Sequence, residues 1–89
     1  MEGIDIARWD AYVKTRRSDA ERNGNRFIVV SDEEIIVEET QPGGPSVSRT
    51  IHRYNDETDT IVVHLRTGVI DPESGNVIDP DTNRIRWIR

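Results

Sequence analysis

Cysteine is missing from this sequence of 89 residues, which excludes disulfide bonds and thiolate metal sites. Long apolar runs are missing as well. No segment approaches the roughly 20 apolar residues that span a bilayer, and no apolar segment follows the N-terminus as it would in a signal peptide. We therefore expect no membrane partner, and a protein that resides in the cytoplasm or in a virion.

Leucine and alanine are scarce. Leu65 is the single leucine and there are three alanines, against eleven isoleucines and nine valines. Helical cores favour leucine and alanine, whereas β-branched side chains suit a pleated sheet. Most of the core should therefore be strand. We expect a single domain over residues 1–89, because a chain of this length has no room for a second.

Negative charge dominates only part of the chain. The net charge is −5, yet residues 27–83 hold three basic and twelve acidic residues, while residues 84–89 hold three arginines and no acid. Proteins that bind duplex nucleic acid neutralise phosphates with Lys and Arg, so an acidic protein is a poor candidate for that task. A nucleic-acid partner is therefore less favoured than a protein partner.

One helix is predicted, over about residues 5–22. Ile6, Trp9 and Val13 recur at spacings of three and four residues and form an apolar stripe. Asp5 can cap the start by accepting hydrogen bonds from free backbone N–H groups. Asn23-Gly24 supplies the left-handed residue that commonly ends a helix.

The remaining chain, residues 26–89, has the pattern of strands. The runs 26–31 and 34–40 are short and β-branched, while 46–55 and 59–67 alternate apolar and polar residues. We therefore predict an α+β fold, with the N-terminal helix packed on an antiparallel, largely meander sheet of four to six strands.

The helix should pack against one face of this sheet. The segment QPGGP, residues 41–45, must be a turn or a loop because it combines two prolines with two glycines. Helix residues Ile6, Trp9 and Val13 are expected to meet the sheet residues Ile28, Val30, Ile36, Ile61, Val63 and Trp87.

Two similar stretches, DPESG at 71–75 and DPDTN at 79–83, predict hairpin turns. In each, Asp accepts hydrogen bonds within the turn, Pro fixes φ, and Gly or Asn takes the positive φ that closes it. Ile70 should then face Val77. The second stretch also matches the first three ligand positions of a calcium loop, but Arg84 stands where that loop needs glycine. The turn is the preferred interpretation, and no metal or other cofactor is predicted.

The two histidines, His52 and His64, lie in consecutive predicted strands. If the hairpin between these strands centres near residue 58, the imidazoles face each other, with Tyr54 and Arg66 nearby. Two imidazoles so placed could cleave RNA by general acid–base chemistry, and these four residues are the catalytic candidates. The favoured alternative places both histidines on the solvent face of the hairpin.

Charged residues supply the candidates for protein contacts. Arginines on the helix and the C-terminal segment could pair with acidic residues of this chain or of a neighbour. The candidate interaction residues are Arg16, Arg17, Arg84, Arg86 and Arg89 on the basic side, and Asp32, Glu33, Glu34, Glu38 and Glu39 on the acidic side.

Three functions stay open, and nothing in the sequence demands catalysis. The first is a non-catalytic assembly or structural subunit of a larger complex, for example a small virion-type protein, acting through protein–protein contacts. The second is a small acidic inhibitor or immunity-type protein that blocks a basic site on a partner. The third is a histidine-based ribonuclease. Segregated charge, and strand edges that must be paired or protected, favour the first.

Overall fold

A computed structural model describes residues 3–40 and 43–89, with side chains from residue 7 onward in the helix. The helix α1 extends from Gly3 to Asn23 without a break, and Gly24 follows with a φ of 73°. The residue with positive φ at its C-terminal end is therefore confirmed. The predicted cap at Asp5 and the contact of Ile6 lie outside the described side chains, and part of the loop 41–45 lies outside the described residues.

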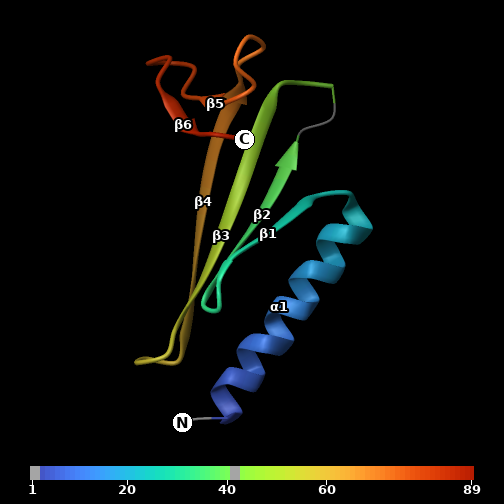
Figure 1. Ribbon diagram of the computed structural model, residues 1–89, viewed down its shortest axis with the longest axis vertical. Helices are drawn as coiled ribbons and strands as arrows, with labels where there is room; N and C mark the ends of the chain where they lie inside the picture. Colours follow the sequence, from blue (N-terminus) through green and yellow to red (C-terminus); the bar gives the residue numbers. More distant parts are fainter. Residues whose placement is uncertain (1–2, 41–42) are drawn as a thin grey trace.

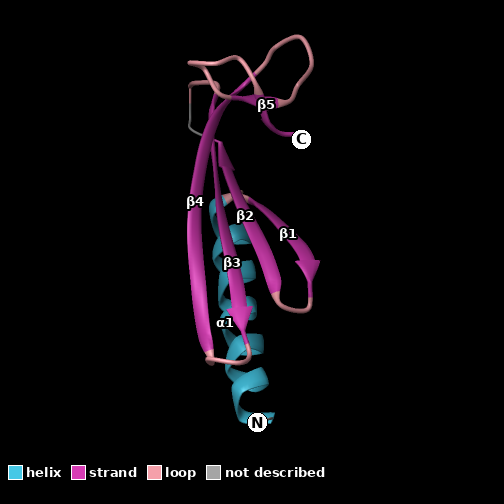
Figure 2. Cartoon of the chain, turned by 90° about the vertical axis from the view of Figure 1, so that its left-hand side faces the viewer, coloured by secondary structure: helices cyan, strands magenta, loops and turns pink. Residues whose placement is uncertain are grey.

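Six antiparallel strands follow in the order in which they occur along the chain (Figure 1). Their bounds are β1 Arg26–Ser31, β2 Glu34–Thr40, β3 Ser46–Asn55, β4 Thr60–Ile70, β5 Val77–Ile78 and β6 Ile85–Trp87. Figure 2 shows the sheet from the face opposite the helix, with α1 behind the strands. The predicted α+β fold with a meander sheet is confirmed.

Both predicted hairpin turns are present near the C-terminus. Ile70 pairs with Val77 across the first, and Ile78 pairs with Ile85 across the second. The closing residues Gly75 and Asn83 have φ values of 78° and 60°. These turns form as predicted because their chemistry is local to five residues.

The core lies between α1 and one face of the sheet. Trp9, Ile35 and Tyr54 form its buried centre. The indole of Trp9 stacks on the rings of Tyr12 and Tyr54, with ring centroids 5.7 and 5.6 Å apart. Around this centre pack the partly buried residues Tyr12, Val13, Phe27 and Ile61.

The prediction of which sheet face meets the helix is wrong for three of its six sheet residues. Ile35 points toward α1, so its neighbour Ile36 points away, and Ile28 pairs with Ile36 on that far face. Trp87 also lies there, because its Nε1 donates to Glu38. The physical reason is that β1 and β2 carry β-branched residues on both faces, so alternation does not mark one side.

The remaining three residues of that prediction have separate outcomes. Ile61 packs against the core as predicted. Val63 shares the helix side with Ile61 but lies 51% exposed, because the helix packs mainly on β1 and β2. Val30 stands at a register shift in β1 and is also 51% exposed.

The molecule is extended for its length. Its radius of gyration is 14.9 Å and its extents are 47 × 27 × 15 Å. A compact domain of 89 residues would have a radius of gyration of about 12 Å. One helix cannot cover a sheet of six strands, so β-branched side chains of the sheet remain in contact with water.

Gly68 allows the C-terminal hairpin to pack against β4. A Cβ at this position would lie 2.4 Å from Cγ1 of Val77 and 2.9 Å from the backbone oxygen of Ile78. We expect Gly68→Ala to lower the free energy of unfolding by about 1–3 kcal/mol, because the backbone of β5 must shift. Urea denaturation measures this. The control is Gly44→Ala, where the nearest atom is the Ser46 nitrogen at 4.0 Å; equal losses in the two variants would contradict the prediction.

Candidate functional site

The outer edge of β4 is the most prominent unpaired element of the sheet. On the side away from β3, β5 pairs only with Val69 and Ile70. Among the described residues, no strand therefore pairs with Thr60–Gly68 on that outer side. The backbone nitrogen of Ile70 donates to Pro45 on the β3 side. Hydrogen-bond direction alternates along an antiparallel strand. The odd-numbered residues therefore direct their N–H and C=O groups outward; they are Ile61, Val63, Leu65 and Thr67.

This edge lacks most of the features that protect strand edges. Residues 60–68 contain no proline and no lysine, and their pairing with β3 is regular. Leu65 and Val63 are 68% and 51% exposed. The opposite edge, β1, is shorter and carries a register shift between Val29 and Ser31. The edge of β4 is therefore the better site for adding a strand.

A buried carboxylate organises the far face of the sheet. Glu38 is only 2% exposed and accepts hydrogen bonds from Arg26, Arg49 and Arg89, at 3.0–3.1 Å. The indole Nε1 of Trp87 donates to the same carboxylate at 3.1 Å, and the guanidinium of Arg49 lies 4.9 Å from the Trp87 ring centroid. Glu38 thus joins β1, β2 and β3 to the C-terminal segment.

The pKa of Glu38 reflects two opposing effects. Burial alone would raise it, but hydrogen bonds from Arg49, Arg89 and Trp87 outweigh burial and lower the pKa below 4.5. The carboxylate is therefore ionised at neutral pH. The sequence suggested Glu38 as an accessible interaction residue, but its side chain is buried and engaged within the chain.

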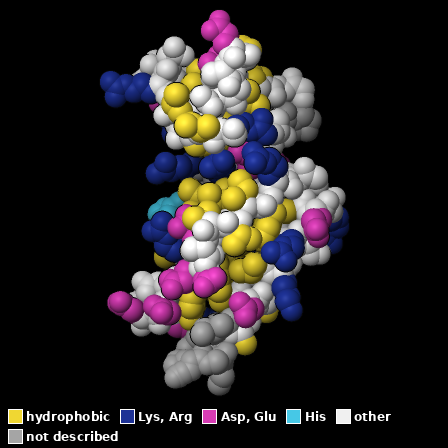
Figure 3. All heavy atoms as spheres, viewed as in Figure 1, with side chains coloured by type: hydrophobic (Ala, Val, Ile, Leu, Met, Phe, Trp, Pro, Cys, Tyr) yellow, Lys and Arg dark blue, Asp and Glu magenta, His cyan; other side chains and the backbone are white. Residues whose placement is uncertain are grey.

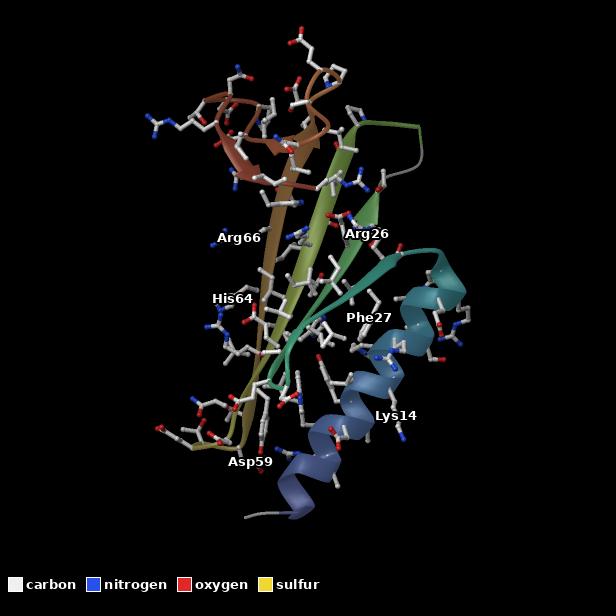
Figure 4. The ribbon with its side chains drawn as sticks, viewed as in Figure 1. Lys14, Arg26, Phe27, Asp59, His64 and Arg66 are labelled. Carbon is white, nitrogen blue, oxygen red and sulfur yellow. The ribbon has the colours of Figure 1, made fainter. Side chains whose placement is uncertain are left out.

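Three arginines around one carboxylate leave an excess of positive charge at the middle of the molecule. In Figure 3 the basic side chains form a belt across this region, and acidic side chains gather at the lower end. Figure 4 shows Arg26 and Arg66 at this height, on β1 and β4. Among the described residues, no carboxylate lies within ion-pair distance of Arg66.

His52 lies inside the protein, which corrects the prediction of a solvent-facing side chain. It is 6% exposed, and its Nδ1 hydrogen-bonds the hydroxyl of Tyr12 at 2.7 Å. Burial, and then the positive charge of Arg16, lower the pKa of His52. The imidazole is therefore held neutral between the helix and the sheet.

The protein should become less stable as the pH is lowered, because of His52. Its pKa is lowered in the folded state, so the neutral form is the stabilising one, and this contribution is complete above the unfolded value of about 6.5. Below that pH the unfolded state binds the proton more readily, and stability declines as pH falls through the folded pKa. Urea denaturation between pH 8 and pH 5 measures this. His52→Gln should flatten the slope, and a slope in His52→Gln equal to that of the natural protein would refute this assignment.

The four catalytic candidates do not form one site. His52 pairs with Val63, and His64 pairs with Ile51, so the two imidazoles lie on opposite faces of the sheet. Tyr54 is buried in the core and donates to Asp59. Figure 4 shows His64 and Arg66 on β4, away from the helix. The geometry proposed for RNA cleavage is thus absent, because the hairpin pairs one residue away from the predicted register.

The remaining basic candidates mostly have partners within the chain. Arg16 lies over the ring of Tyr12 and binds Asp19, and Arg17 lies over the ring of Phe27. Arg86 binds Asp79 at 3.1 Å, and Arg89 binds Glu38. Arg84 is exposed, and no described carboxylate lies within ion-pair distance of it.

The acidic candidates lie in different parts of the sheet and do not form one surface. Glu34 pairs with Arg53 at 3.0 Å, and Glu39 is exposed on the face opposite Glu38. Asp32 and Glu33 are exposed in the turn between β1 and β2, and the backbone oxygen of Asp32 accepts from the Trp9 indole. Asp32 and Glu33 therefore remain the accessible acidic pair of this segment.

The aspartates of the C-terminal turns serve the turns themselves. A hydrogen bond from the Ser74 hydroxyl lowers the pKa of Asp71. The carboxylate of Asp79 accepts from the backbone N–H of Asp81, which lowers its pKa, and from Arg86. These bonds confirm the prediction that both stretches are hairpin turns.

Comparison of this chain with protein-family models, with curated proteins and with solved structures finds no match. Within the described residues, no helix has the length and apolar character needed to cross a membrane, and no three acidic or histidine side chains gather in a way that could hold a metal ion.

Proposed function

We propose that this protein is a non-catalytic assembly subunit that binds another protein chain through the free edge of β4. The observation that carries this proposal is the free outer edge of Thr60–Gly68, which is long, regularly paired with β3 on its inner side, and carries the exposed apolar side chains of Val63 and Leu65. A strand added to this edge would satisfy the outward N–H and C=O groups and would cover Val63 and Leu65.

The extended shape supports the same function. A sheet covered on only part of one face leaves apolar side chains in water, and exposed apolar surface of this kind commonly marks a protein contact. Val62 and Val63 are 42% and 51% exposed on the two faces of β4, next to Leu65. A partner strand on this edge would contact both faces at once.

Site-specific photo-crosslinking tests this function. A photoreactive amino acid replaces Leu65 in the full chain, expressed in living cells, and Lys14 carries the same group as the control. Lys14 is exposed on the helix, away from β4 (Figure 4). We expect a discrete adduct from position 65 and none from position 14. Absence of an adduct at position 65, or equal adducts at both positions, would overturn the proposal.

A further inference from the structure

We propose that the chain bound at the β4 edge is a second copy of this protein, paired antiparallel about a two-fold axis at His64. This inference rests on the proposed function and specifies its partner. Two antiparallel copies of one strand edge are complementary by symmetry, since each presents the same backbone groups to the other. The two copies would form one continuous sheet with both helices on the same side.

The register follows from the direction of the backbone groups. The outward residues are Ile61, Val63, Leu65 and Thr67, and outward residues of one copy must pair with outward residues of the other. An axis at His64 pairs Val63 with Leu65 and Ile61 with Thr67, which uses all four. An axis at Val63 or Leu65 would leave Thr67 or Ile61 without a partner inside the free edge.

Side chains on the helix side agree with this register. Val63 of one copy would face Leu65 of the second, and Leu65 would face Val63, so four apolar side chains meet across the axis. These are among the most exposed apolar residues of the chain, at 51% and 68%. The pairing would therefore cover the part of this face that α1 leaves open.

The pairing also places an acidic hairpin tip near an arginine at each of its two ends. In this register Gly68 lies opposite Thr60 of the second copy, which brings the acidic hairpin tip of one copy to the C-terminal hairpin of the other. The tip contains the exposed residues Asp56 and Glu57. The side chain of Arg86 lies against Gly68, 3.4 Å from the position of a Cβ. At each end, the acidic tip of one copy would thus lie near Arg86 of the other, an arginine that also binds Asp79 of its own chain.

Disulfide trapping tests the partner and the register together, because the natural chain has no cysteine. In the proposed pair, residue 64 lies opposite residue 64 in a non-hydrogen-bonded position, with Cα atoms about 4.5 Å apart. A disulfide needs a Cα separation below about 7 Å. We expect oxidised His64→Cys to form a covalent dimer rapidly.

The control is Val62→Cys, a neighbouring exposed position on the same face. In the proposed pair, the cysteines of the two copies would be four residues apart along the strands, about 13 Å, so this variant should not cross-link alone. A mixture of Val62→Cys and Arg66→Cys should cross-link, since these residues face each other. Failure of His64→Cys to cross-link, or equally rapid cross-linking of Val62→Cys alone, would overturn the register.

Sedimentation equilibrium measures the association without any cross-link. The double variant Val63→Lys/Leu65→Lys should raise the dimer dissociation constant at least about 100-fold, because it places charge where four apolar side chains meet. Val30→Lys, at a position equally exposed in β1, should leave it unchanged. A natural chain that is monomeric at every concentration would overturn the inference. In that case the proposed function would still hold if photo-crosslinking at position 65 captured a different protein. If nothing were captured, both the inference and the proposed function would be refuted.

Discussion

Replacement of Glu38 by alanine is expected to lower the free energy of unfolding by about 3 kcal/mol. The variant removes the only carboxylate that the described residues place beside Arg49, whose side chain is 16% exposed. It also leaves the indole N–H of Trp87 without its acceptor. The loss should fall at the lower end of the range for broken buried ion pairs, because Arg26 and Arg89 keep contact with water.

Urea denaturation at pH 7 measures this loss, and Glu39→Ala is the matched control. Glu39 is the next residue of β2, is exposed and points to the opposite face, so its removal should change stability by less than about 0.5 kcal/mol. Amide hydrogen exchange should also accelerate in β5 and β6 of Glu38→Ala, because Trp87 and Arg89 lose their anchor. Equal stability of the two variants would refute the anchoring role of Glu38.

The same carboxylate gives the protein a second dependence on pH. The pKa of Glu38 is lowered in the folded state, so its contribution to stability is present above the unfolded value of about 4.5. This contribution is lost as pH falls through the folded pKa. This loss of stability at acidic pH should be absent from Glu38→Ala and present in His52→Gln. The two variants therefore separate it from the loss caused by histidine protonation.

Replacement of Trp9 by alanine is expected to lower the free energy of unfolding by about 3–5 kcal/mol. Trp9 is 4% exposed and stacks on Tyr12 and Tyr54, so truncation opens a cavity at the centre of a small core. Its Nε1 also donates to the backbone oxygen of Asp32 at 2.7 Å, which ties the helix to the turn between β1 and β2. Loss on this scale is a large part of the stability of a typical domain.

Thermal and urea denaturation measure this effect, with Val30→Ala as the control because that side chain is half exposed. Trp9→Phe should recover much of the loss, since it keeps an aromatic ring between the two tyrosines while losing the indole N–H. A loss below 1 kcal/mol in Trp9→Ala would show that the helix contributes little to the core.

The sequence predicted those features that depend on residues close together in the chain. The helix, the strands and both C-terminal turns follow from periodicity and turn chemistry within short windows. The face of the sheet was not predictable, because Ile28 and Ile36 on one side are as apolar as Phe27 and Ile35 on the other. That choice depends on where the helix packs, which is a tertiary property.

The candidate site was predicted less well, for two physical reasons. The register of the β3–β4 hairpin differs by one residue from the prediction, which sends His52 and His64 to opposite faces. Glu38 gathers partners as far as 51 residues along the chain, so no local pattern marks it as buried. The free edge of β4 could be suspected from a strand-rich chain, but its location required the strand order.

The position of Glu38 in the chain has a consequence for partial unfolding. Trp87 and Arg89 donate to Glu38 from 49 and 51 residues away, whereas every strand pairing of the described sheet joins strands that are consecutive in the chain. The C-terminal segment can therefore detach as a unit while β1 to β4 keep their pairing. Its detachment would leave Arg26 and Arg49 on the carboxylate and open the far face of the sheet to water.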